Sequence, residues 1–232
     1  MSETSDKITG VSELPLFPLP LVLFPGVPLP LHIFEPRYRQ MLDDIRVTNN
    51  LFGLSFLDDS AENEIPPAGH VGCAAEVTEV QTMPDGRSNI LTVGLIRYRI
   101  EKYVERDREY LTAQVSFFED EPEDNELLHS SAREVAATFT RIARSVRKIN
   151  DERTNLPDIS DTEPQRLSFL VSAAVELDMN TKQTLLELRS TAGRLDRLRE
   201  ILALVVGNYE ERARIHDLAK GNGHSGKKFE ME

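Results

Sequence analysis

The strongest constraint in the 232-residue sequence is an abrupt change of pattern near residue 120. Before it, short apolar runs are interrupted by proline and glycine, which is typical of short strands joined by turns. After it, apolar residues recur every three or four positions, which indicates helices. An acidic, proline-containing segment at 119–124 separates the two patterns. We therefore predict an α+β chain with a β-rich subdomain at 12–120, an α-helical subdomain at 121–218, and disordered tails at 1–11 and 219–232.

Prolines dominate the first apolar runs. A proline cannot donate a hydrogen bond to a neighbouring strand, so strands that contain it lie at an edge, are short, or are bulged. The prolines concerned are Pro15, Pro18, Pro20, Pro28 and Pro30. Pro36 instead suits the first turn of a helix, and Pro84-Asp85-Gly86 between two apolar runs predicts a hairpin. These signals together predict five or six short strands and one early helix.

The second half predicts several helices. An apolar seam with alternating steps of four and three marks the first of them, formed by Val135, Phe139, Ile142, Val146 and Ile149. Thr162-Glu163-Pro164 is a start signal for the next helix, and Thr181 is expected to cap a short one. Leu195 and Leu198 begin the apolar face of the last helix.

Composition excludes several classes of protein. The chain has 27 basic and 39 acidic side chains, a net charge of −12, which opposes binding to nucleic acid or to anionic membranes. No apolar run reaches the ~18 residues of a membrane span, and the polar start does not match a signal peptide. A cytoplasmic location is therefore expected. The single cysteine, Cys73, rules out a disulfide within the chain and a cysteine zinc cluster.

Catalytic and cofactor signals are weak, so we expect no enzyme activity, no cofactor and no metal. The five histidines are scattered; His32 is interpreted as structural and Cys73 as a buried, inert thiol. Residues 221–227 fit most of a phosphate-binding loop, but Lys228 stands where the magnesium-binding hydroxyl is needed. Two basic clusters are interpreted as solvated faces or as docking sites for an acidic partner: Arg97 and Arg99 on a strand, and Arg141, Arg144 and Lys148 on a helix.

Residues 14–38, which include Leu-Pro-Leu-Phe-Pro-Leu and Ile-Phe-Glu-Pro-Arg-Tyr, closely resemble the opening of the Lon N-terminal domain, the substrate-binding region of the ATP-dependent protease Lon. The second stretch looks more like stand-alone bacterial versions and copies fused to RING-finger proteins. Residues 182–198 are similar to the family's C-terminal helical stretch. The resemblance covers roughly residues 12–210. It implies a PUA-like β pseudobarrel of about six strands, with one early helix, followed by a helical bundle.

The resemblance also implies a function. It suggests a non-catalytic module that binds unfolded or hydrophobic polypeptide segments in protein quality control, with a protease or chaperone as a further partner. Phe34, Arg37 and Tyr38 are the candidate polypeptide-binding residues, although Phe34 and Tyr38 also suit a role in fixing the helix to the sheet. The alternative is a PUA-like RNA-binding or regulatory protein, which the charge of residues 1–120 (10 basic, 19 acidic) opposes. A hydrolase is disfavoured because no ATPase or Ser–Lys dyad is recognised, and homo-oligomerisation is left open.

Overall fold

The computed structural model describes residues 3–58, 65–152 and 155–222. Its strands are β1 (Glu13–Leu19), β2 (Pro28–Ile33), β3 (Leu51–Phe56), β4 (Val71–Thr82), β5 (Ser88–Tyr103) and β6 (Leu111–Phe118). Its helices are α1 (Glu3–Ile8), α2 (Pro36–Arg46), α3 (Asn125–Ile149), α4 (Pro164–Ala174), α5 (Met179–Glu187) and α6 (Thr191–Asn222). The α+β class, the six strands and the early helix are confirmed.

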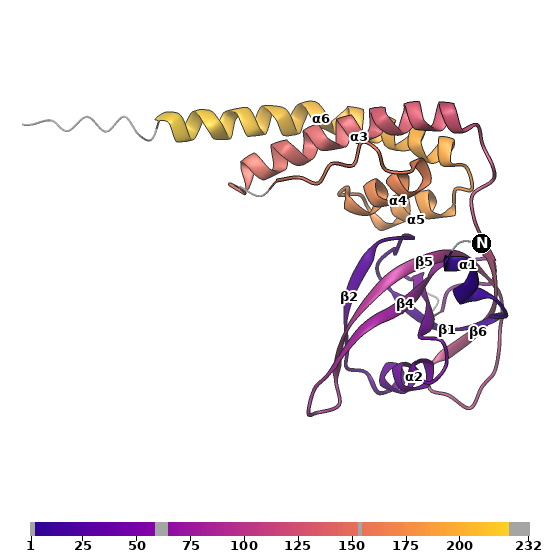
Figure 1. Cartoon of the computed structure of the whole chain (residues 1–232). Coiled ribbons are helices and arrows are strands. Elements are labelled where there is room, and N and C mark those ends of the chain that lie inside the picture. The colour runs from indigo at the N-terminus through magenta and orange to yellow at the C-terminus, as the bar shows by residue number, and fades with distance from the viewer. Residues whose placement is uncertain (1–2, 59–64, 153–154, 223–232) are drawn as a thin grey trace, which may run out of the picture. The chain divides into compact units, whose positions relative to one another are not determined.

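The strands form one sheet in the order β2-β5-β4-β3-β1-β6. Figure 1 shows β2, β5 and β4 beside one another. A further pairing of β5 with β6 closes β1, β3, β4, β5 and β6 into a ring. The long strand β5 makes this possible, because it pairs with β2 along its first half and with β6 along its second half. β2 therefore lies outside the ring. The predicted hairpin is confirmed, since β4 and β5 are joined by a turn in which Gly86 has a φ of +81°.

The core of this β-rich unit has two parts. One lies between the sheet and α2, whose buried residues are Tyr38, Met41, Leu42 and Ile45. The other surrounds Tyr98, which is fully buried and shares a 2.6 Å hydrogen bond with the Ser55 hydroxyl. Gly53 and Gly72 make room for this ring, because a Cβ atom on either would lie under 3 Å from it. Glycine inside a strand thus marks a close approach here.

Contacts divide the chain into two units, and the division differs from the predicted boundary at 120/121. Residues up to Pro122 form one unit together with Ser172–Ser190, while Glu123–Val171 and the chain from Thr191 onward form the other. The segment 172–190 was expected to belong with the other helices. It packs with the strands instead, because β4 and β5 supply polar partners for it: the Gln183 amide donates to the Val71 carbonyl over 2.9 Å.

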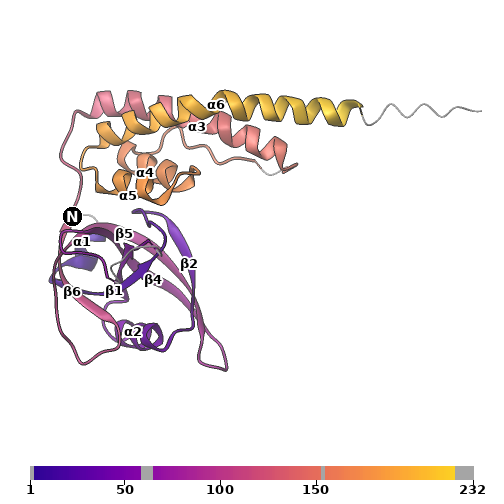
Figure 2. The ribbon, with the colours of Figure 1, turned by 180° about the vertical axis from the view of Figure 1, so that it is seen from behind.

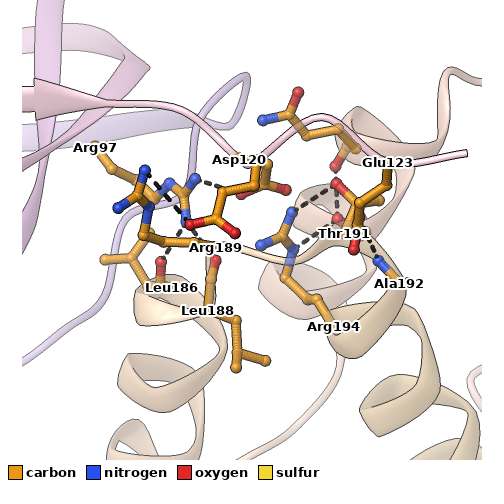
Figure 3. Close-up of polar contacts among 12 residues, drawn as sticks. Arg97, Asp120, Glu123, Leu186, Leu188, Arg189, Thr191, Ala192 and Arg194 are labelled. Atoms are coloured by element: carbon orange, nitrogen blue, oxygen red, sulfur yellow. Dashed lines mark hydrogen bonds and ion pairs between the residues drawn. The ribbon is translucent and has the colours of Figure 1, made fainter.

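Arg97 is the second such partner. Its guanidinium donates to the carbonyls of Leu186, over 3.1 Å, and Leu188, at the C-terminal end of α5, and it pairs with the Asp120 carboxylate (Figure 3). The last carbonyls of a helix have no partner within the helix, so this cation satisfies them. The interpretation of Arg97 as part of a solvated face was wrong: its side chain is 1% exposed, whereas Arg99 on the same face is exposed.

The helical unit is built on α3 and α6, which lie side by side in both views (Figures 1 and 2). Their ion pairs join Arg141 to Glu210 and Lys148 to Asp217, each 69 residues apart. A constant separation means that the two helices run parallel and in register. The predicted seam on α3 is buried at Val135 and Ile142, and α6 buries Leu195, Leu198 and Leu202.

Three local predictions need correction or restriction. Residues 3–8 are helical and α6 continues to Asn222, although both segments were assigned to the tails. The short helix α5 is capped by Asp178, which accepts from the Thr181 amide, so Thr181 is not the cap. In the phosphate-loop pattern, residues 221 and 222 end α6, and 223–228 lie outside the described residues.

Other features concern the described part of the chain as a whole. None of its helices combines the length and the apolar character needed to cross a membrane. Its His, Cys, Asp and Glu side chains nowhere gather into a group of three that could hold a metal ion. Cys73 is fully buried, as predicted, and burial raises the pKa of its thiol to about 12.

Candidate polypeptide-binding surface

Strand β2 and the first half of β5 form the candidate surface. Among the strands that the structure describes, β2 has a neighbour on one side only, since β5 pairs with it over Pro28–Ile33. Its side chains alternate: Ile33 and its odd-numbered neighbours face the core, and the even-numbered residues face outward. One backbone edge and one side-chain face of β2 are therefore accessible.

The prolines of β2 fall on its accessible backbone edge. The Val27 carbonyl accepts from the Gly94 amide over 3.0 Å, so residue 27 points its backbone groups at β5. By the two-residue period of a strand, the odd-numbered residues point at β5 and residues 28, 30 and 32 point away. Pro28 and Pro30 have no N–H group. The open edge thus offers carbonyl acceptors at three positions but an amide donor at His32 alone.

The outer side-chain face is largely apolar. Pro28 lies opposite Val93 in the ladder, and Pro30 lies opposite Leu91, which like Val93 is half-buried. Phe34, just beyond β2, is 58% exposed. We call Pro28, Pro30, Phe34, Leu91 and Val93 the outer apolar face.

Polar groups border this face. The His32 ring shares a 2.7 Å hydrogen bond between its Nδ1 and the Asn89 carboxamide oxygen, and it stacks on Phe34 at a centroid distance of 6.0 Å. His32 therefore has a structural partner, as predicted, although its side chain is exposed. On the side of β5 away from β2, Leu91 pairs with Glu79 of β4. The face is thus a small apolar strip with a polar margin.

The three predicted binding residues occupy different environments. Phe34 is exposed, so it does not fix the helix to the sheet. Tyr38 does, since its ring is 5% exposed and its centroid lies 4.0 Å from that of Phe17, and burial raises its pKa. Arg37 is half-exposed: it pairs with Glu35 over 2.8 Å and lies over the Tyr38 ring. Solvent therefore reaches Phe34 and Arg37, while Tyr38 is buried and its ring contacts the Arg37 guanidinium.

Leu91 and Val93 were not identified from the sequence. They alternate with the buried Ile90 and Thr92, so the strand has two partly apolar faces. Only the pairing of Pro30 with Leu91 shows that prolines and leucine share one face. The sequence does show that this strand carries apolar residues on both of its faces. That pattern does not identify the strand that pairs with it.

A scan against protein-family models gives one match that covers most of the chain. Residues 13–203 match the ATP-dependent protease La (LON) substrate-binding domain. The chain belongs to this family. The predicted resemblance is therefore confirmed, and both stretches that suggested it fall within the matched range.

Relatives of this Lon-domain chain include whole Lon proteases. It is 27% identical over 208 residues to the Lon protease of Brevibacillus choshinensis, covering 88% of this chain and 26% of the relative. It is 28% identical over 194 residues to the Lon protease of Syntrophomonas wolfei, covering 82% and 24%. The chain spans about a quarter of the length of the curated relatives it matches.

Two solved structures share the Lon-domain fold. A Lon N-terminal domain protein from Xanthomonas campestris gives a TM-score of 0.58 at 23% identity, covering 81% of this chain and 97% of that one. The N-terminal domain of a Mycobacterium avium complex Lon protease gives 0.62 at 17%, covering 82% and 98%. At these identities the comparison supports the fold.

Proposed function

We propose that this Lon-domain protein is a non-catalytic module that binds exposed apolar segments of other polypeptides, in the context of proteolysis. The observation that carries the proposal is the outer apolar face, which exposes Phe34 beside two prolines on the accessible strand of the sheet. Membership of a substrate-binding domain family supports the same class of ligand.

The geometry supports binding through side chains more than through strand pairing. A guest strand laid along β2 would find carbonyl acceptors, but two of the three positions on that edge are prolines and cannot donate in return. An alternating strand ladder needs both donors and acceptors on each strand, so a guest strand could pair with β2 only in part. Apolar guest side chains could instead lie on Phe34, Leu91 and Val93. This mode does not require one particular guest sequence.

The expected affinity is modest. Fully burying two large guest side chains would contribute about 3–6 kcal/mol, and ordering the guest offsets part of this. The dissociation constant should therefore fall at about 40 µM or weaker. Weak, sequence-tolerant binding suits a module that must also release its ligand.

Fluorescence anisotropy with a labelled, unstructured peptide rich in leucine and phenylalanine tests the proposal. A matched peptide with serine in their place should not bind. Phe34→Ser should weaken binding about fivefold, the effect of losing about 1 kcal/mol of apolar contact. Val47→Ser is the control: Val47 is also exposed, at 84%, but at the far end of α2, about 16 Å from the end near Phe34. Equal effects of the two variants would contradict the proposed surface.

Two further assays separate the competing functions. Casein should remain intact with the purified protein, with or without ATP, because the proposal assigns no catalytic group. RNA should not be retained at moderate salt; salt-dependent retention would favour the RNA-binding alternative. A pull-down from native cells that recovers a protease or chaperone together with unfolded clients would support a role in delivery.

A further inference from the structure

The charge pattern between α3 and α6 has one irregular position. Along the parallel pair, basic residues of α3 face carboxylates of α6 at a separation of 69: Arg141 faces Glu210, with contacts of 2.9 and 3.0 Å, and Lys148 faces Asp217 at 3.4 Å. Two residues of α3 between them are also basic: Arg147, which pairs with Glu152 over 3.4 Å, and Arg144. The same offset, 144 + 69 = 213, places Ala213 opposite it.

Ala213 provides no charge to balance Arg144. It is a buried methyl group, 4% exposed. Arg144 is exposed and forms no ion pair with any carboxylate in the part of the chain that the structure describes. Arg141 and Lys148, one turn away along α3 on either side, both pair with carboxylates of α6. Arg144 is thus a cation held beside a helix pair without its own counter-charge.

A recess of about 330 Å³ lies at this position. Ser145 and Ala213, both small and buried, line it and leave the space open. Arg144 and Arg214 supply long basic side chains to its lining. The Arg141–Glu210 and Lys148–Asp217 pairs flank it one helical turn away on either side. The volume is at the lower end of the ~300–1,000 Å³ range of ligand pockets.

We propose that this recess binds a carboxylate side chain of an acidic polypeptide segment. The Arg144 guanidinium presents a planar pair of donors that matches a carboxylate, and a bidentate pair is the strongest form of such contact. Arg214 adds a second cation, although it already pairs with Glu211 at 2.7 Å. The lining side chains sum to four cations and two carboxylates, a local charge of +2 in a chain of net −12.

The flanking carboxylates favour a polypeptide over a nucleic acid. A nucleic-acid strand carries a phosphate at every nucleotide, so its neighbouring phosphates would approach Glu210 and Asp217. A polypeptide can place one carboxylate in the recess and keep neutral residues beside it. This surface lies on the helical unit and is independent of the outer apolar face, so either proposal can fail alone.

The test uses the full chain and a peptide of alternating glutamate and serine that carries a neutral dye. Anisotropy is measured at about 50 mM salt, where charge interactions are weakly screened. We expect this peptide to bind and its glutamine analogue not to bind. Arg144→Gln should weaken binding at least about fivefold, because the charge-assisted contact is lost. It should not disturb folding, since Arg144 is exposed and makes no ion pair among the described residues.

Arg133→Gln is the matched control. Arg133 is also exposed and lies on α3, three turns or about 16 Å from Arg144, outside the recess. It should change the dissociation constant less than twofold. Equal weakening by both variants would show diffuse attraction and overturn the proposal. Absence of binding by the glutamate peptide would overturn it too, as would tighter binding of a single-stranded RNA that Arg144→Gln abolishes.

Discussion

Replacing Arg97 by methionine should destabilise the β-rich unit strongly. The substitution leaves the Asp120 carboxylate, 6% exposed, without its cation, and it removes the donor from the Leu186 and Leu188 carbonyls. Breaking a buried ion pair from one side costs about 3–5 kcal/mol, because the remaining charge stays buried. The Leu186 and Leu188 carbonyls also lose their donor, the first of them in a buried position, so the loss should not fall below this range. We expect a loss of about 3–5 kcal/mol.

Urea unfolding followed by tyrosine fluorescence measures this loss. The chain has five tyrosines and no tryptophan, and all of the tyrosines except Tyr209 lie before residue 122, within the β-rich unit. Arg99→Met is the control on the same strand face; Arg99 is exposed and donates to the Gly69 carbonyl. Its effect should stay below about 1 kcal/mol.

A double variant isolates the cause. Arg97→Met combined with Asp120→Leu removes the buried carboxylate together with its cation, and well-packed apolar replacements of buried pairs are often tolerated. The double variant should therefore be more stable than Arg97→Met alone by about 2 kcal/mol. A single variant no less stable than Arg99→Met, or a double variant less stable than the single, would refute the argument from the buried charge.

Three further predictions concern the same unit. Gly94→Ala would place a Cβ atom 2.3 Å from the Phe24 carbonyl oxygen, so thermal unfolding by circular dichroism should show a loss of about 1–3 kcal/mol. Burial lowers the pKa of His70, with Glu187 opposing. The fold therefore favours neutral His70, and stability should fall as pH drops below about 6.5. His70→Gln should flatten that decline. An unchanged pH profile in this variant would contradict the role of His70. The Cys73 thiol, with its pKa raised to about 12, should react with a disulfide reagent at pH 8 only after unfolding; rapid native reaction would contradict its burial.

Local signals in the sequence predicted the elements, but not the contacts between distant segments. Pro84-Asp85-Gly86 specifies its hairpin because the turn geometry depends on those residues alone. Arg97 was misjudged because its burial depends on Asp120 and on Leu186, which lie 23 and 89 residues away. Strand alternation placed Arg97 and Arg99 on one face correctly. It could not show that another segment covers only one of them.

The candidate surface was also predicted only in part: the edge strand and the buried helix face followed from the sequence, but the exposure of Phe34 did not. The prolines of the second apolar run indicated an edge strand, and β2 is one. Exposure of Phe34 and burial of Tyr38 depend on where α2 begins and which of its faces meets the sheet. Helical spacing predicted the buried face correctly, with Tyr38, Met41 and Ile45. Phe34 precedes the helix, so its orientation follows the strand, which no helical period describes.

Under the proposed function, the prolines of β2 favour capture of a polypeptide through side chains over strand pairing with a second copy of the chain. An open edge with both donors and acceptors is a template for pairing with any extended chain, and it promotes aggregation. Pro28 and Pro30 remove two donors from that edge, and their rings add apolar surface to the adjoining face. Strand pairing is thereby weakened while side-chain contact is strengthened. Because side-chain contacts tolerate many guest sequences and release them readily, this arrangement favours temporary capture over permanent association.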